Sequence, residues 1–253
     1  MRKRSVKRWL LLGIVSLSIG SLGYAQTQPQ ISVLSRGIWV AEMGQISGRE
    51  VFTLTQSGDA LQLTSEGYVR VPQKLEERVS AVLRLSLDYK PMSYTVLQMV
   101  EEPPGSNSIT FIHGQASISG GQARVRREKV PSGTPEEKTL QTTKTWAVLE
   151  DEVLSHILLL PRLYQLAGKA ELEIAGLIPL AGVVVEGKLS RLAPVQLVAD
   201  GKESTAERLL LTGGSQPTEL LTQQSELIGA VRSGQRTPFV YRGDLFPKGF
   251  QVK

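Results

Sequence analysis

An alternation of apolar and polar residues with a period of two constrains the fold of this chain more than any other feature. Leu83, Leu85 and Leu87 alternate with polar residues, and the same pattern recurs within residues 61–64 and 171–174. Because neighbouring residues of a strand point to opposite faces, each such strand has one apolar and one polar face. This pattern is typical of antiparallel sheets that have one covered face and one solvated face.

Turn-forming residues separate these stretches at short intervals. Ser57-Gly58-Asp59, Gly120-Gly121 and Asp200-Gly201 each stand between two candidate strands. Gly and Asp suit tight hairpins because such turns need positive φ angles. We therefore predict a mainly β chain with about ten strands in a single curved antiparallel sheet. A twisted sheet of this size curls, so a half-barrel or open barrel with a concave face is expected.

The segment 151–167 interrupts the alternation with a helical pattern. It starts with two acidic residues, which favour a helix N-terminus. Pro161 predicts a break in the helix and Gly168 its end. We expect one apolar helix packed on the concave face, because so apolar a helix is not stable on a wet surface. The alternative is that residues 157–160 form another core strand. The apolar residues at helical spacing include Val153, Ile157 and Leu160.

Charge and targeting signals are concentrated in the first 25 residues. Residues 1–25 contain five basic residues and no acidic one, an apolar run at 10–22, and small residues at 23 and 25. This is the pattern of a signal peptide, so we expect export to the periplasm or the extracellular space and a soluble product after cleavage. The alternative is an uncleaved N-terminal anchor. Five of the 29 basic residues lie there, which leaves 24 basic against 24 acidic residues and argues against nucleic-acid binding.

The rest of the chain, residues 26–253, is predicted to be a single β domain. Residues 126–138 are polar and rich in Pro and Gly, and we interpret them as an exposed loop between strands. An open sheet has edge strands that can pair with a second chain, so the sequence leaves the oligomeric state open.

The residue types present exclude several kinds of chemistry. The chain has no Cys and two His, which excludes disulfides, thiol nucleophiles and Cys- or His-rich metal sites. Ser155 and His156 are neighbours on the predicted helix and point in different directions, so they do not form a nucleophile–base pair. Arg242-Gly243-Asp244 is interpreted as a turn near the C-terminus. We expect no catalytic residue, no metal and no cofactor.

These features together resemble the curved half-barrel proteins of bacterial envelopes, which include the carriers and receptors that localise lipoproteins to the outer membrane. The similarity is one of architecture over residues 30–245 and carries over no site residue. It implies an open cup that holds acyl chains against an apolar concave wall, with a helix as plug or lid.

The sequence therefore predicts a non-enzymatic protein that binds a lipid or acyl chain. One alternative is a structural or interaction protein of the envelope, with a filled core and a protein partner. Another is an envelope hydrolase. The candidate ligand-wall residues are Leu83, Leu85, Leu87, Val153, Ile157 and Leu160, and the candidate rim residues are Phe239, Tyr241 and Phe246 in the aromatic C-terminal segment, whose structural interpretation is a plug for the end of the core.

Overall fold

The computed structural model describes residues 31–253 except 106–107, 132, 151–152 and 214–216. The predicted signal peptide at 1–25 therefore lies outside the described residues. Within the described part of the chain no helix is long and apolar enough to cross a membrane.

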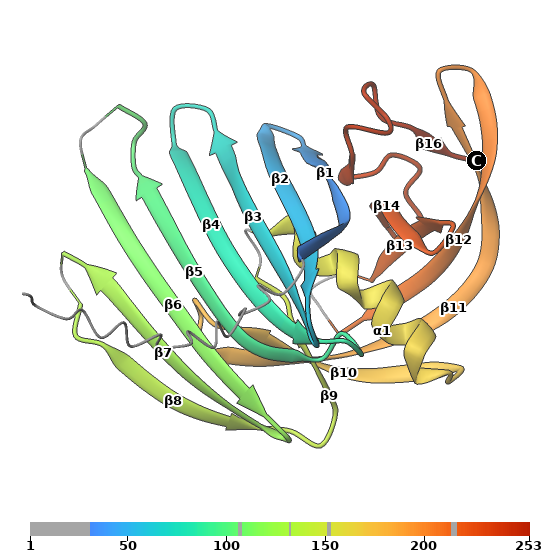
Figure 1. Ribbon diagram of the computed structural model, residues 1–253. Helices are drawn as coiled ribbons and strands as arrows, with labels where there is room; N and C mark the ends of the chain where they lie inside the picture. Colours follow the sequence, from blue (N-terminus) through green and yellow to red (C-terminus); the bar gives the residue numbers. More distant parts are fainter. Residues whose placement is uncertain (1–30, 106–107, 132, 151–152, 214–216) are drawn as a thin grey trace, which may run out of the picture.

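The described residues form one open sheet with a short helical segment (Figure 1), so the predicted mainly β class is confirmed. In space the strands follow the order β8-β7-β6-β5-β4-β3-β2-β1-β15-β14-β13-β12-β11-β10-β9, and β16 pairs with β11. The strands are β1 Ile31–Met43, β2 Ile46–Ser57, β3 Ala60–Val71, β4 Leu75–Ser86, β5 Pro91–Glu101, β6 Ile109–Ser119, β7 Gln122–Val130, β8 Glu136–Gln141, β9 Thr145–Val148, β10 Glu171–Ile178, β11 Val183–Ala199, β12 Lys202–Thr212, β13 Thr218–Gln223, β14 Glu226–Arg232, β15 Val240–Arg242 and β16 Gln251–Val252.

The expected strand number of about ten is wrong, because the described sheet has sixteen strands. The missed strands include β15 and β16, of three and two residues, which are too short to show an alternation. In β9, Trp146, Ala147 and Val148 are all buried and do not alternate, so the sequence pattern does not separate this strand from β8. β9 also pairs in parallel with β10, so the sheet is not wholly antiparallel.

The prediction of an exposed loop at 126–138 is also wrong, because most of these residues belong to strands. Its first residues belong to β7 and its last to β8, and the two strands pair as a hairpin from Gln122↔Gln141 to Arg127↔Glu136. β8 is exposed along most of its length, so it lacks the apolar face that identifies a strand in a sequence. The Pro and Gly residues mark the short connection between the strands.

The predicted helix is present as two shorter elements. A 3-10 helix, η1, spans Leu154–Leu159, and the α-helix α1 spans Leu160–Ala167. Pro161 stands in the first turn of α1, where its missing N–H costs nothing, so it starts the α-helix instead of breaking it. The helix ends as predicted at Gly168, which has a φ of 60°. The acidic pair at 151–152 lies outside the described residues.

The sheet curls so that its two ends approach each other. Three residues, 142–144, connect β8 at one edge to β9 at the other edge. A link of this length spans at most about 15 Å, so the two edges are neighbours in space. β9 packs across β5, and the Leu180 side chain lies so close to β6 that a Cβ at Gly114 would be 3.1 Å from it.

The concave side of the curled sheet holds the main core. Inward residues of β2 to β7 and of β10 to β14 meet η1 and α1 there. The buried apolar residues of the helical segment include Val153, Leu158, Leu159, Leu160 and Leu163. A second apolar cluster forms where β16 and the C-terminal aromatic segment cover β11 and β14.

The helical segment should be essential for stability. Leu160 is fully buried, so Leu160→Ala should lower the free energy of unfolding by about 2–5 kcal/mol through lost burial and a new cavity. The matched control is Leu166→Ala on the same helix, where the side chain is 58% exposed and the change should be small. Urea unfolding followed by circular dichroism measures both. Equal losses for the two variants would contradict the packing described above.

Candidate functional site

Five of the six candidate wall residues pack in the core instead of lining an open hollow. Leu83, Leu85, Val153 and Leu160 are buried, and Ile157 is half-buried against the same cluster. Leu87 is different, because β4 ends at Ser86 and Leu87 is exposed in the turn that follows.

The three candidate rim residues lie along the seam that joins the N-terminal and C-terminal parts of the sheet. Phe239 packs against the main core, just before β15. Tyr241 in β15 and Phe246 belong to the second cluster, where their rings lie 6.5 Å and 5.0 Å from the ring of Phe250. These contacts fit the interpretation that the C-terminal segment plugs an end of the core.

The space between η1 and the strands next to it is small. The cavity bounded by Leu54, Leu158 and Leu159 has a volume of about 50 Å³. Sites for small organic ligands have volumes of about 300–1,000 Å³. As the protein stands, this cavity has no room for an acyl chain.

A cluster of buried polar side chains binds the start of the helical segment to the sheet. Glu50 is only 2% exposed, because its side chain lies on the inward face of β2 together with Gly48 and Phe52. Its carboxylate accepts the backbone N–H groups of Leu154, at 2.5 Å, and Ser155, at 3.0 Å. It therefore satisfies free N–H groups at the start of the helical segment, a task usually done by a residue of the helix itself.

Burial dominates the electrostatics of Glu50. Loss of solvent raises the pKa of its carboxyl group, and the hydrogen bonds from Ser155 and Leu154 and from the Ser65 side chain oppose that rise.

His156 and Glu150 complete this cluster. The Nδ1 atom of His156 accepts the backbone N–H of Glu150 at 3.2 Å, and the Glu150 carboxylate accepts the N–H of Leu180 at 3.1 Å. The His156 ring stands edge-on to Tyr94, with the ring centroids 5.0 Å apart. Burial lowers the pKa of His156 to about 3, so the imidazole is neutral at pH 7.

The cluster is suited to holding backbone segments in place rather than to catalysis. Glu50, Glu150 and His156 are each at most 4% exposed, so a substrate has no access to them. Each of these three side chains accepts at least one backbone N–H group. Within the described part of the chain, no group of His, Asp and Glu residues is arranged to hold a metal ion.

Sequence reasoning missed Glu50 and Glu150. For Glu50 a signal was available, because a charged residue occupies an inward position of an alternating strand. Its partners at 154 and 155 are about a hundred residues away in the chain, so no local pattern links them.

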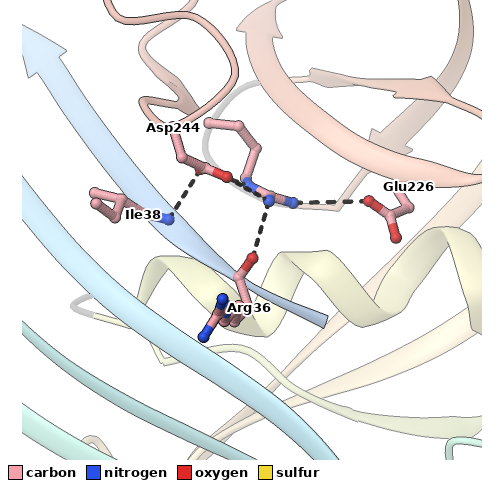
Figure 2. A network of polar contacts seen from close by, with 5 residues as sticks. Arg36, Ile38, Glu226 and Asp244 are labelled. Atoms are coloured by element: carbon pink, nitrogen blue, oxygen red, sulfur yellow. Dashed lines mark hydrogen bonds and ion pairs between the residues drawn. The ribbon is translucent and has the colours of Figure 1, made fainter. Parts of the chain in front are cut away.

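Arg242 is the centre of a second buried polar site, and it is more than part of a turn. It is the last residue of β15, is 3% exposed, and pairs with Trp39 of β1 in the sheet register. Asp244 binds it through two contacts, Nε to Oδ1 at 2.9 Å and Nη2 to Oδ2 at 2.7 Å. Nη2 also donates to the backbone carbonyl of Arg36 at 3.1 Å, and Nη1 lies 3.9 Å from the Glu226 carboxylate (Figure 2).

The environment of Arg242 shows how closely it is fitted to the seam between β1 and β15. The guanidinium lies 5.1 Å from the centroid of the Phe52 ring and 5.9 Å from that of Trp39. A Cβ at Gly37 would be 2.5 Å from the guanidinium, so only glycine fits there. The Arg-Gly-Asp triplet is therefore a structural element of the seam and its arginine is not available to a partner.

Asp244 also binds β1 directly. Its Oδ1 atom accepts the backbone N–H of Ile38 at 3.0 Å (Figure 2). Burial alone would raise the pKa of Asp244, but Arg242 and the Ile38 N–H outweigh that effect, and the pKa is lowered.

Comparison with known proteins finds a likeness in structure alone. No family model matches the chain. No curated protein matches it either. A similar solved structure is the crystal structure of a β-barrel-like protein of the domain of unknown function DUF1849 from Brucella abortus. The TM-score is 0.49 at 12% sequence identity, covering 86% of this chain and 94% of that chain. This likeness assigns neither a family nor a function, and the resemblance to lipoprotein-localisation proteins stays a prediction.

The burial of His156 predicts a specific loss of stability in acid. Because its pKa is about 3 in the folded protein and about 6.5 when unfolded, the unfolded state binds the extra proton between these values. The free energy of unfolding should therefore fall by up to about 1.4 kcal/mol per pH unit from pH 6.5 towards pH 3. Glu50 acts in the opposite sense, since its raised pKa makes its contribution weaken as pH rises above 4.5.

The His156 effect is isolated with His156→Asn, whose side-chain oxygen can accept the Glu150 N–H without titrating. The difference between wild type and variant should shrink as pH falls from 6.5, measured by urea unfolding at several pH values. His113→Asn in β6 is the matched control and should leave the pH profile unchanged. A constant difference for His156→Asn across the range would contradict the neutral, buried imidazole.

Arg242→Lys should destabilise the seam although the charge is kept. Lys lacks the planar fork that binds Asp244 twice and the Arg36 carbonyl once, and a buried charge with fewer partners costs about 2–5 kcal/mol in the free energy of unfolding. Thermal and urea unfolding measure the loss. The control is Arg191→Lys, whose side chain is 64% exposed and paired with Glu207, and it should change stability little.

Proposed function

We propose that this chain is a non-enzymatic interaction protein of the cell envelope, exported by its N-terminal segment, with a filled interior and a protein partner. The observation that carries the proposal is the occupied concave face. The cavity between η1 and the neighbouring strands is only about 50 Å³, and four of the six candidate wall residues are buried. Binding of an acyl chain at that place would require the helical segment to leave. Binding of an acyl chain therefore stays a prediction, with less support than the interaction function.

The outer face of the sheet supplies a surface for a partner. Met99 in β5, Phe111 in β6 and Val130 in β7 are direct cross-strand neighbours. Phe111 and Val130 are exposed, as are Leu97 and Ile109 beside them. We call these five residues the outer patch. Exposed apolar residues that gather in this way mark interaction surfaces more often than scattered ones do.

The residues next to the outer patch favour a protein as the partner. In the neighbouring strands Tyr68 lies between Arg49 and Arg78 in the cross-strand register. Tyr, Phe, Met and Arg are the residue types enriched in protein interfaces. The arginines are interspersed with acidic residues, among them Glu76, which pairs with Arg78 at 2.9 Å. A surface of mixed charge is not one that attracts a phosphate polymer.

Site-specific photo-crosslinking in the native envelope tests this proposal. A photo-reactive amino acid at Phe111 should give one discrete protein adduct that mass spectrometry identifies, and Leu97→Asp should reduce its yield. The matched control carries the probe at Leu166, an exposed apolar residue of α1. No adduct at Phe111, or the same adducts at both positions, would overturn the proposal. A stoichiometric lipid in extracts of the purified protein would instead favour the ligand-carrier alternative.

A further inference from the structure

An open hollow of about 590 Å³ lies beside α1, between that helix and strands β11 to β13. We call it the polar hollow. It is on the same side of the sheet as the main core, because its wall residue Leu209 belongs to that core. Its volume is within the range of small-ligand sites, about 300–1,000 Å³. Its polar lining includes Gln165, Lys169, Arg191, Glu207, Thr222 and Ser225.

Part of the wall is apolar and fixed in position. Leu209 and Pro161 contribute buried apolar side chains. The ring of Tyr164 forms another wall, and its hydroxyl donates to the backbone carbonyl of Ala170 at 2.9 Å. This bond holds the ring across the end of the helix. A ligand can therefore place one apolar face against a preformed surface.

The rim carries donors and acceptors side by side. Arg191 in β11 binds Glu207 in β12, with Nη2 2.9 Å from Oε2, and the two side chains are 64% and 62% exposed. Glu207 faces Thr222 of β13 in the sheet register. The guanidinium presents several N–H donors, and the carboxylate presents acceptors only. Two adjacent hydroxyl groups of a ligand, each both donor and acceptor, can match this pair.

We propose that the polar hollow binds a saccharide through a pair of neighbouring hydroxyl groups. The ring carbons of the sugar would lie against Leu209 and Tyr164, and its hydroxyls would reach Arg191, Glu207 and Thr222. An acyl chain does not suit the charged rim. A phosphate suits it less well than a sugar, because Arg191 is already paired with the Glu207 carboxylate, which leaves Lys169 as the one basic group of the described lining without a carboxylate 2.9 Å away. This inference goes beyond the protein-interaction function proposed above and does not depend on it.

Titration followed by amide NMR signals of the full chain tests the inference. The probes are maltotriose and tri-N-acetylchitotriose, added to about 20 mM because an open site predicts a Kd of about 1 mM. Binding should shift the signals of residues around the hollow, such as 165, 169, 207 and 222, in a saturable way with at least one probe.

Matched double variants separate the hollow from the rest of the surface. Arg191→Ala with Glu207→Ala should weaken binding at least tenfold without unfolding the protein, because exposed ion pairs add little to stability. The control is Lys188→Ala with Glu171→Ala, which removes a pair of the same kind, 2.8 Å apart between β10 and β11. Its affinity should equal that of the wild type.

Three results would overturn the inference. The first is no saturable shift with either sugar. The second is a shift of the same signals by inorganic phosphate when the sugars cause none, since this would identify a simple anion site. The third is sugar binding that the Arg191–Glu207 double variant leaves unchanged. None of these results bears on crosslinking at the outer patch, so the two proposals fail independently.

Discussion

The fold depends on a covalent constraint: three residues join the two opposite edges of a sixteen-stranded sheet. A link this short forces the sheet to curl until β8 and β9 are neighbours, without pairing them. β9 pairs in parallel with β10, because the helical segment between the two strands is a crossover connection. The concave space enclosed in this way is what η1 and α1 fill.

Hydrogen bonds to buried carboxylates hold η1 and α1 in the concave space, in addition to their apolar contacts. Glu50 reaches from β2 to the first N–H groups of the helical segment, and Glu150 reaches from that segment to the turn at Leu180. Each bond joins parts of the chain that apolar packing alone would allow to slide. Burial of a carboxylate costs free energy, so its presence at Glu50 fits a role in fixing one arrangement of the helical segment. The main interior is therefore occupied, and the surfaces left for recognition lie outside it.

Local patterns predicted the parts of this structure that local physics determines. The inward positions Leu83 and Leu85 followed from strand alternation, and the end of α1 at Gly168 followed from its need for positive φ. β8 and β9 were not recognised as two separate strands, because β9 is buried on both faces and β8 on neither. The polar cluster and the polar hollow escaped because they join distant segments. Glu50 finds its partners about a hundred residues later, and Tyr164 and Arg191 line one hollow from two separate elements, α1 and β11.

The seam between β1 and β15 has a consequence for the order of folding. Trp39 pairs with Arg242, so the two strands that join the halves of the sheet are separated by almost the whole described chain. Contacts of such long sequence separation pay a large loop-closure entropy and form late. Strands β2 to β8 are linked by hairpins and can assemble while the C-terminal strands are still being made. Until β15 arrives, the edge of β1 is an unpaired template for other chains, which makes β15 a safeguard against misassembly.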